Sequence, residues 1–102
     1  GVSMLTKNDV TKTIQANIEE IKKYGVKRIG IFGSFARATQ NNKSDIDILV
    51  EFEKGEKIFD NYKELKFYLE RLLHRKVDLV IKDAVKPSIK QTVLREVAYA
   101  RL

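Results

Sequence analysis

The hydrophobic positions of this chain follow two periods, and each period predicts a different kind of element. Helical spacing of apolar residues predicts one helix over residues 7–24, a second over residues 58–73 and a third that begins at Pro87. Thr6 is the expected N-cap of the first helix, and Gly25 is its expected C-terminal stop. The apolar positions that set the spacing are Val10, Ile14, Ile18 and Ile21, then Phe59, Tyr62, Leu65, Leu69 and Leu72, and finally Ile89, Val93 and Val97.

Short runs rich in β-branched residues predict three strands, over residues 26–32, 45–52 and 77–81. The second run alternates, so one face carries Ile46 and Ile48 while the other carries the acidic residues. The order helix, strand, strand, helix, strand, helix predicts an α/β (α+β) domain with a short sheet flanked by helices. Because no repeat or linker interrupts this order, we expect a single domain over residues 4–102.

Two aspartates share one face of the second predicted strand, where an apolar pair would be ordinary. Asp45 and Asp47 are two residues apart, so their carboxylates project side by side. Like charges this close disfavour joint ionisation unless a cation compensates, and Mg²⁺ prefers oxygen ligands. A third acid, Asp78, interrupts the apolar run VDLVI, and it joins the pair if its strand lies beside the second strand.

A glycine and a serine, Gly33 and Ser34, follow the first predicted strand directly. Glycine allows a sharp turn and close approach of a ligand, while the serine adds a hydroxyl and an amide where anions are favoured. Taken singly, such a turn or an Asp-Ile-Asp run more often serves the geometry of the chain than the binding of a ligand. In this order, each at a strand end, the elements indicate a turn that accepts phosphate and a strand that holds a metal ion.

These residues resemble the signature of the DNA polymerase beta-like nucleotidyltransferase superfamily. Gly33-Ser34 is followed after ten residues by Asp45-Ile46-Asp47, as that signature requires. The runs GSFAR, SDIDILVEF and VDLV are similar to the small stand-alone members called minimal nucleotidyltransferases, or MNT proteins. The similarity extends from about Val26 to the C-terminus, where VLREVAYA also resembles the usual family ending.

The resemblance implies a short mixed sheet flanked by helices and assigns roles to several residues. Asp45 and Asp47 would bind Mg²⁺, and Asp78 would be the third carboxylate, which coordinates the catalytic metal and helps to deprotonate the attacking hydroxyl. Gly33 and Ser34 would contact the triphosphate. The role of Arg37 is open between two interpretations: it either reaches a phosphate or forms a structural salt bridge.

One departure from the family pattern lies next to this arginine. Ala38 stands where the family often has glycine, and alanine adopts a positive φ less readily than glycine does. The departure concerns the geometry of the loop, because the residues assigned to the chemistry are unchanged.

Charge and composition change this picture little. The net charge is +6, but the positive residues are scattered, and the densest run is only His74-Arg75-Lys76. The absence of cysteine excludes disulfides and thiolate metal sites. The apolar runs are too short for a bilayer, and with no secretory h-region the chain is expected to be cytoplasmic. Residues 1–3 precede the only methionine and are interpreted as a cloning remnant.

For the function, the resemblance implies transfer of AMP from ATP to a hydroxyl, with release of pyrophosphate. The core fold uses the whole chain, so the acceptor is expected to come from a protein partner. MNT proteins are commonly encoded beside all-helical HEPN proteins and act as antitoxins to these ribonuclease toxins, by adding AMP to a tyrosine. Adenylylation (AMPylation) of a HEPN partner is therefore the function we expect.

Two alternatives belong to other classes. A binding-only antitoxin would mask its toxin by contact, without transfer. A nucleic-acid-binding module would account for the charge of +6, but no aromatic and basic surface for such binding is recognisable in the sequence. The number of AMP units added, the nucleotide preference and association into a homo-oligomer are left open.

Overall fold

A four-stranded mixed β-sheet forms the centre of the structure, a computed structural model that describes residues 5–41, 43–55 and 57–101. The strands lie in the order β3-β2-β1-β4; β1 pairs antiparallel with β2 and β4, whereas β2 and β3 are parallel. The expected cloning remnant at residues 1–3 lies outside the described ranges. The strands are β1 (Val26–Phe32), β2 (Ile46–Phe52), β3 (Val77–Ile81) and β4 (Ala98–Tyr99).

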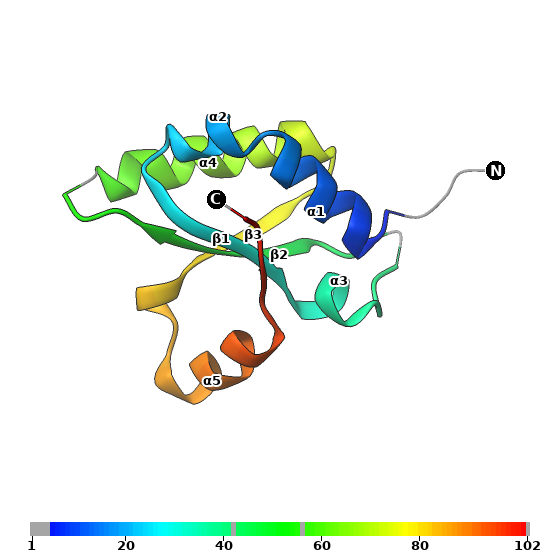
Figure 1. Cartoon of the computed structure of the whole chain (residues 1–102). Helices are drawn as coiled ribbons and strands as arrows, with labels where there is room; N and C mark the ends of the chain where they lie inside the picture. The colour runs from blue at the N-terminus through cyan, green and yellow to red at the C-terminus, as the bar shows by residue number, and fades with distance from the viewer. Residues whose placement is uncertain (1–4, 42, 56, 102) are drawn as a thin grey trace.

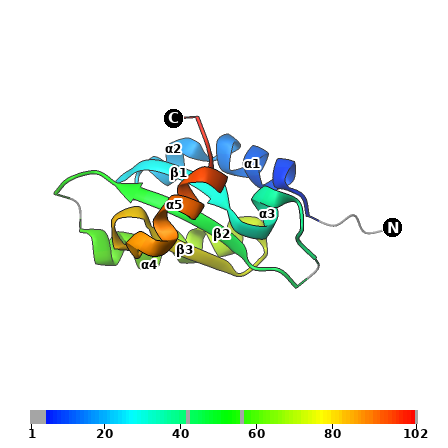
Figure 2. The ribbon, with the colours of Figure 1, turned by 90° about the horizontal axis from the view of Figure 1, so that it is seen from below.

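Helices cover the two faces of this sheet unequally. Helices α1, α2 and α4 lie on one side, and α5 lies on the opposite side with α3 at the end of β1 (Figure 1). Seen from below, α5 crosses the sheet beside α3 (Figure 2). The helices are α1 (Lys7–Ala16), α2 (Ile18–Lys22), α3 (Gly33–Arg37), α4 (Ile58–Leu73) and α5 (Pro87–Glu96), with a 3-10 turn over Lys82–Ala84. Within the described part of the chain, no helix is long and apolar enough to cross a membrane.

The alternation along β2 divides its side chains between two environments, as the sequence predicts. Ile46, Ile48 and Val50 are fully buried in the main core, which they share with side chains of α1, α2 and α4. Leu49 points to the opposite face and is also buried, on the side that α5 covers. The face that carries Asp47 is therefore only partly closed.

The first predicted helix is wrong in its continuity, because the structure divides it at Asn17. Thr6 caps α1 as expected and forms a reciprocal capping box with Asp9. Asn17 leaves the helical conformation (φ −115°, ψ 20°), and its side-chain amide donates to the carbonyl of Thr13 at 2.8 Å. Asparagine competes in this way with the helical backbone bonds, so a new short helix begins after it.

The last predicted helix ends one residue earlier than its apolar spacing implies. Val97 is extended, and the chain then forms β4 along β1, with Gly30 opposite Tyr99. A side chain at Gly30 would stand 2.7 Å from the carbonyl oxygen of Ala98, so glycine there lets β4 approach. Arg28 lies over the ring of Tyr99 at 3.9 Å from its centre.

Helix α4 has the predicted bounds, but one of its predicted core positions is wrong. Phe59 is 74% exposed, whereas Leu65 and Leu69 are fully buried. Phe59 lies in the first turn of α4, where Lys63 lies over its ring. Leu73, which the predicted stripe omitted, is buried at the other end of the helix.

Candidate active site

The parallel pairing of β2 with β3 brings two of the three candidate aspartates together. Asp47 lies directly opposite Asp78 in the register of the two strands. Asp47 is half-buried and Asp78 is exposed, so the pair sits at the surface of the face that α5 only partly covers. The condition on which the role of Asp78 depends, that its strand lies beside the second predicted strand, is therefore met.

Gly33 stands against Asp47 and cannot be replaced without disturbing it. Its φ of +72° is a conformation that favours glycine. A Cβ atom at this position would collide with Oδ2 of Asp47 and lie 2.9 Å from its Cγ. The turn after β1 therefore places backbone atoms directly beside the carboxylate pair, with Ser34 half-buried as the next residue of α3.

Asp45 lies just before β2 and is exposed, at the end of the loop that leaves α3. Arg75 holds this loop, since its guanidinium donates to the carbonyl of Ser44 at 2.9 Å and lies 5.7 Å from the ring centre of Phe35. The loop starts at Ala38, whose φ of 60° places an alanine in the left-handed region. The chain thus adopts at Ala38 the backbone that the family glycine would favour.

The surroundings of Asp47 favour its protonated form. Partial burial, followed by the charges of Asp78 and Asp45, raises the pKa of Asp47 to about 6, and Arg37 counteracts this only in part. Asp47 therefore gives up its proton far less readily than an ordinary aspartate. A cation between the carboxylates would remove the repulsion.

The structure does not gather all three aspartates into one metal centre. Over the described ranges, no group of three or more acidic, histidine or cysteine side chains is placed to hold a metal ion together. Asp47 and Asp78 nevertheless supply two hard oxygen ligands. This set fits Mg²⁺, which proteins usually hold by one or two carboxylates together with water and substrate phosphates.

Glu96, at the end of α5, is a site residue that the sequence reasoning did not single out. Its carboxylate accepts the backbone N–H of Gly33 at 3.2 Å and a guanidinium N–H of Arg37 at 2.7 Å. Arg37 thus forms the salt bridge that was one of its two readings. Glu96 is the one acid in a helix whose other charged residues are basic, Lys90 and Arg95, which is the signal available in the sequence.

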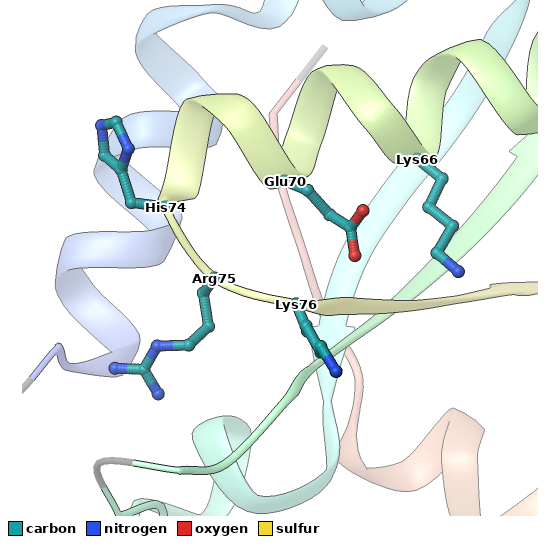
Figure 3. A pocket seen from close by; sticks show the side chains of 5 residues that line it. All are labelled: Lys66, Glu70, His74, Arg75 and Lys76. Atoms are coloured by element: carbon teal, nitrogen blue, oxygen red, sulfur yellow. The ribbon is translucent and has the colours of Figure 1, made fainter.

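A separate open hollow of about 540 Å³ lies between α4 and the connection from α4 to β3. Figure 3 shows its lining from α4 and from the connection to β3, namely Lys66, Glu70, His74, Arg75 and Lys76. Glu70 accepts the N–H of Val77 at 3.0 Å, so an α4 side chain satisfies part of this sheet edge. No aspartate of the site lines the hollow, so it is separate from the candidate active site.

Residues 13–100 match the Nucleotidyltransferase domain family. The chain belongs to this family. The nucleotidyltransferase is 42% identical to protein adenylyltransferase MntA of Thermococcus cleftensis over 99 residues, which are 96% of this chain and 99% of that protein. It is also 52% identical over 79 residues, or 76% of this chain and 80% of the relative, to a candidate protein adenylyltransferase of Methanocaldococcus jannaschii.

Solved structures agree with the fold. A candidate minimal nucleotidyltransferase superposes with a TM-score of 0.81 at 32% identity, covering 95% of this chain and 98% of that one. A chain of a toxin-antitoxin crystal structure with AMP-PNP gives a TM-score of 0.63 at 29% identity and covers 93% and 72% of the two chains. The family resemblance and the mixed sheet flanked by helices are thereby confirmed, and the nucleotidyltransferase is an enzyme of that class.

Proposed function

We propose that this nucleotidyltransferase is a Mg²⁺-dependent protein adenylyltransferase that transfers AMP from ATP to a tyrosine hydroxyl of a HEPN-type toxin and thereby acts as its antitoxin. The observation that carries the proposal is the placement of Asp47 beside Asp78 and against the Gly33 turn. Carboxylates and a turn without a side chain meet there, as a metal-nucleotide complex requires.

The proposed roles follow from positions around that point. Asp47 and Asp78, which lie opposite each other, would hold Mg²⁺ together with Asp45, whose charge also acts on Asp47. The bound ion would neutralise charge on the phosphates of ATP. Gly33 and Ser34 would face the triphosphate, since only a backbone without a side chain fits against Asp47 at this point. Asp78 is the exposed carboxylate of the pair and would face the acceptor.

The reaction is an in-line displacement at the α-phosphorus of ATP. The tyrosine oxygen forms a new bond to this phosphorus while the bond to the bridging oxygen of the β-phosphate breaks, and pyrophosphate leaves. The proton of the hydroxyl passes to Asp78, which is open to solvent and so to the acceptor. The chain's contribution is therefore positioning and proton acceptance.

The proposed acceptor and partner rest on what similar proteins are named for. Protein adenylyltransferase is the name of the Thermococcus cleftensis relative, which matches almost the whole chain. The AMP-PNP complex whose chain shares this fold is a toxin-antitoxin structure. A protein acceptor also suits the geometry, because Asp78 lies on an edge strand of the sheet, where another molecule can reach it.

The test is transfer of label from ATP to a purified HEPN-type toxin, with Mg²⁺ present and the label located by mass spectrometry. We expect AMP on a tyrosine of the partner. Asp78→Asn should lower the rate about 10²- to 10⁴-fold, the usual contribution of a general base. Asp83→Asn is the matched control, since Asp83 is an exposed aspartate in the turn after β3 and should leave the rate unchanged.

The binding-only antitoxin makes a different prediction in the same assay. It requires a tight complex and an inhibited toxin with no label on the partner, whether or not Asp45 and Asp47 are intact. Inhibition that survives both Asp45→Asn and Asp47→Asn would therefore replace the transferase proposal by the binding-only one.

A further inference from the structure

Glu96 accepts hydrogen bonds from two groups of the helix that follows β1. Its Oε2 accepts the N–H of Gly33 at 3.2 Å, and its Oε1 accepts from Arg37 at 2.7 Å. Both donors come from α3, whereas Glu96 comes from the end of α5, 63 residues beyond Gly33 in the chain. A carboxylate of this chain thus lies where an anionic oxygen of a ligand would be attracted.

The two donors differ in how many N–H groups remain for a phosphate once Glu96 is bound. Gly33 has a single backbone N–H, so its bond to Glu96 leaves no proton for a phosphate. Arg37 has five N–H groups, of which the bond to Glu96 uses one, and its side chain is half exposed. A phosphate can therefore share Arg37 with Glu96 but has to displace Glu96 from Gly33.

The side chain of Glu96 can leave without moving the fold. The chain on either side of it is held, because the N–H of Val97 donates to Val93 at 3.0 Å and that of Ala100 donates to Ile29 at 2.8 Å. The side chain itself remains 21% exposed, so rotation about its own bonds takes the carboxylate towards solvent.

We propose that Glu96 is an internal competitor of the nucleotide triphosphate, which occupies the Gly33 amide in the free enzyme and sets the affinity for ATP. The inference rests on the proposed function, since it takes ATP as the ligand of this site. ATP binding then includes the exchange of one carboxylate for a phosphate oxygen at Gly33, and Glu96 weakens binding in proportion to its charge.

The test compares the wild type with Glu96→Gln, which keeps the size of the side chain and removes its charge. Calorimetric titration with ATP and with tripolyphosphate, each with and without Mg²⁺, gives the Kd. We expect Glu96→Gln to bind both ligands about 10-fold more tightly, as suits the loss of one negative charge a few ångström from a polyanion. Glu64→Gln is the matched control, because Glu64 is exposed on α4, on the other side of the sheet. The Kd of this variant for each ligand should equal that of the wild type.

Two results would overturn the inference while leaving the proposed function standing. In the first, the wild type binds ATP and Glu96→Gln binds it with equal or weaker affinity. Glu96 would then be a residue that positions Arg37. The other is measured on the wild type by NMR, where tripolyphosphate should shift the carboxyl carbon of Glu96 and the amide of Gly33 together; an unmoved Glu96 signal at saturation contradicts displacement. A wild type that binds neither ligand would instead reject the proposed function and the inference with it.

Discussion

The carboxylate pair should cost this enzyme stability whenever no cation is bound. The pKa of Asp47 is raised from 3.8 to about 6, first by partial burial and then by Asp78 and Asp45. In the unfolded chain the carboxyl loses its proton near pH 4, whereas in the folded chain it keeps the proton until about pH 6. Between these values the folded state binds more protons, so the free energy of unfolding falls as the pH rises.

The magnitude follows from the same shift. A difference of about two pKa units corresponds to about 3 kcal/mol if the site were shielded from water. Asp47 is only half-buried, and solvent screening reduces this to about 1 kcal/mol. Asp47→Asn removes the charge and should therefore stabilise the metal-free protein by about 1 kcal/mol above pH 6, which raises Tm by about 5 °C in a domain of this size.

The assay is urea unfolding of both proteins in EDTA at pH values from 4 to 8, followed by circular dichroism. The stability difference between Asp47→Asn and the wild type should be near zero at pH 4, grow up to pH 6 and then remain constant. Asp60→Asn serves as the control, since Asp60 is exposed in the first turn of α4 and should not reproduce this profile. A difference that is the same at every pH, or a wild type more stable than Asp47→Asn at pH 8, would refute the argument.

Three further predictions address the metal, the loop and the core. Mg²⁺ at ten times its Kd should stabilise the wild type by about 1.4 kcal/mol and Asp47→Asn by far less, as read from Tm in differential scanning calorimetry. Ala38→Gly should raise the free energy of unfolding by about 1 kcal/mol, because φ at Ala38 is 60°; a destabilised variant in urea unfolding would contradict this. Leu65→Ala should cost about 2–5 kcal/mol and Phe59→Ala less than about 1 kcal/mol, since Leu65 is fully buried and Phe59 is 74% exposed; equal costs would contradict the burial.

Sequence reasoning succeeded where a property repeats along one element. The bounds of α4 follow from an apolar stripe over 16 residues, and a single misplaced member such as Phe59 does not shift them. The faces of β2 follow from strict alternation, which places Asp47 opposite the core face. The meeting of Asp47 with Asp78 needed only one further assumption, that the second and third strands are neighbours.

It failed where a contact between distant residues decides the local structure. The two residues of β4 show no strand pattern of their own, and their pairing depends on Gly30 leaving room on β1. Glu96 joins the site only because α5 crosses the sheet and ends beside α3, which no spacing within α5 reveals. Asn17 breaks its helix by a side-chain bond that competes with the backbone, although the apolar spacing continues beyond it.

Several unfavourable features of this chain lie in one short region. Between residues 33 and 47 the chain has a glycine at φ +72° pressed against a carboxylate, an alanine at φ 60° and an aspartate with a raised pKa. The core face of β2, formed by Ile46, Ile48 and Val50, has no such strain and is fully buried. Since the contact of Gly33 and the raised pKa both involve Asp47, a ligand that removes the repulsion there would stabilise this region, which is the property expected of a binding site.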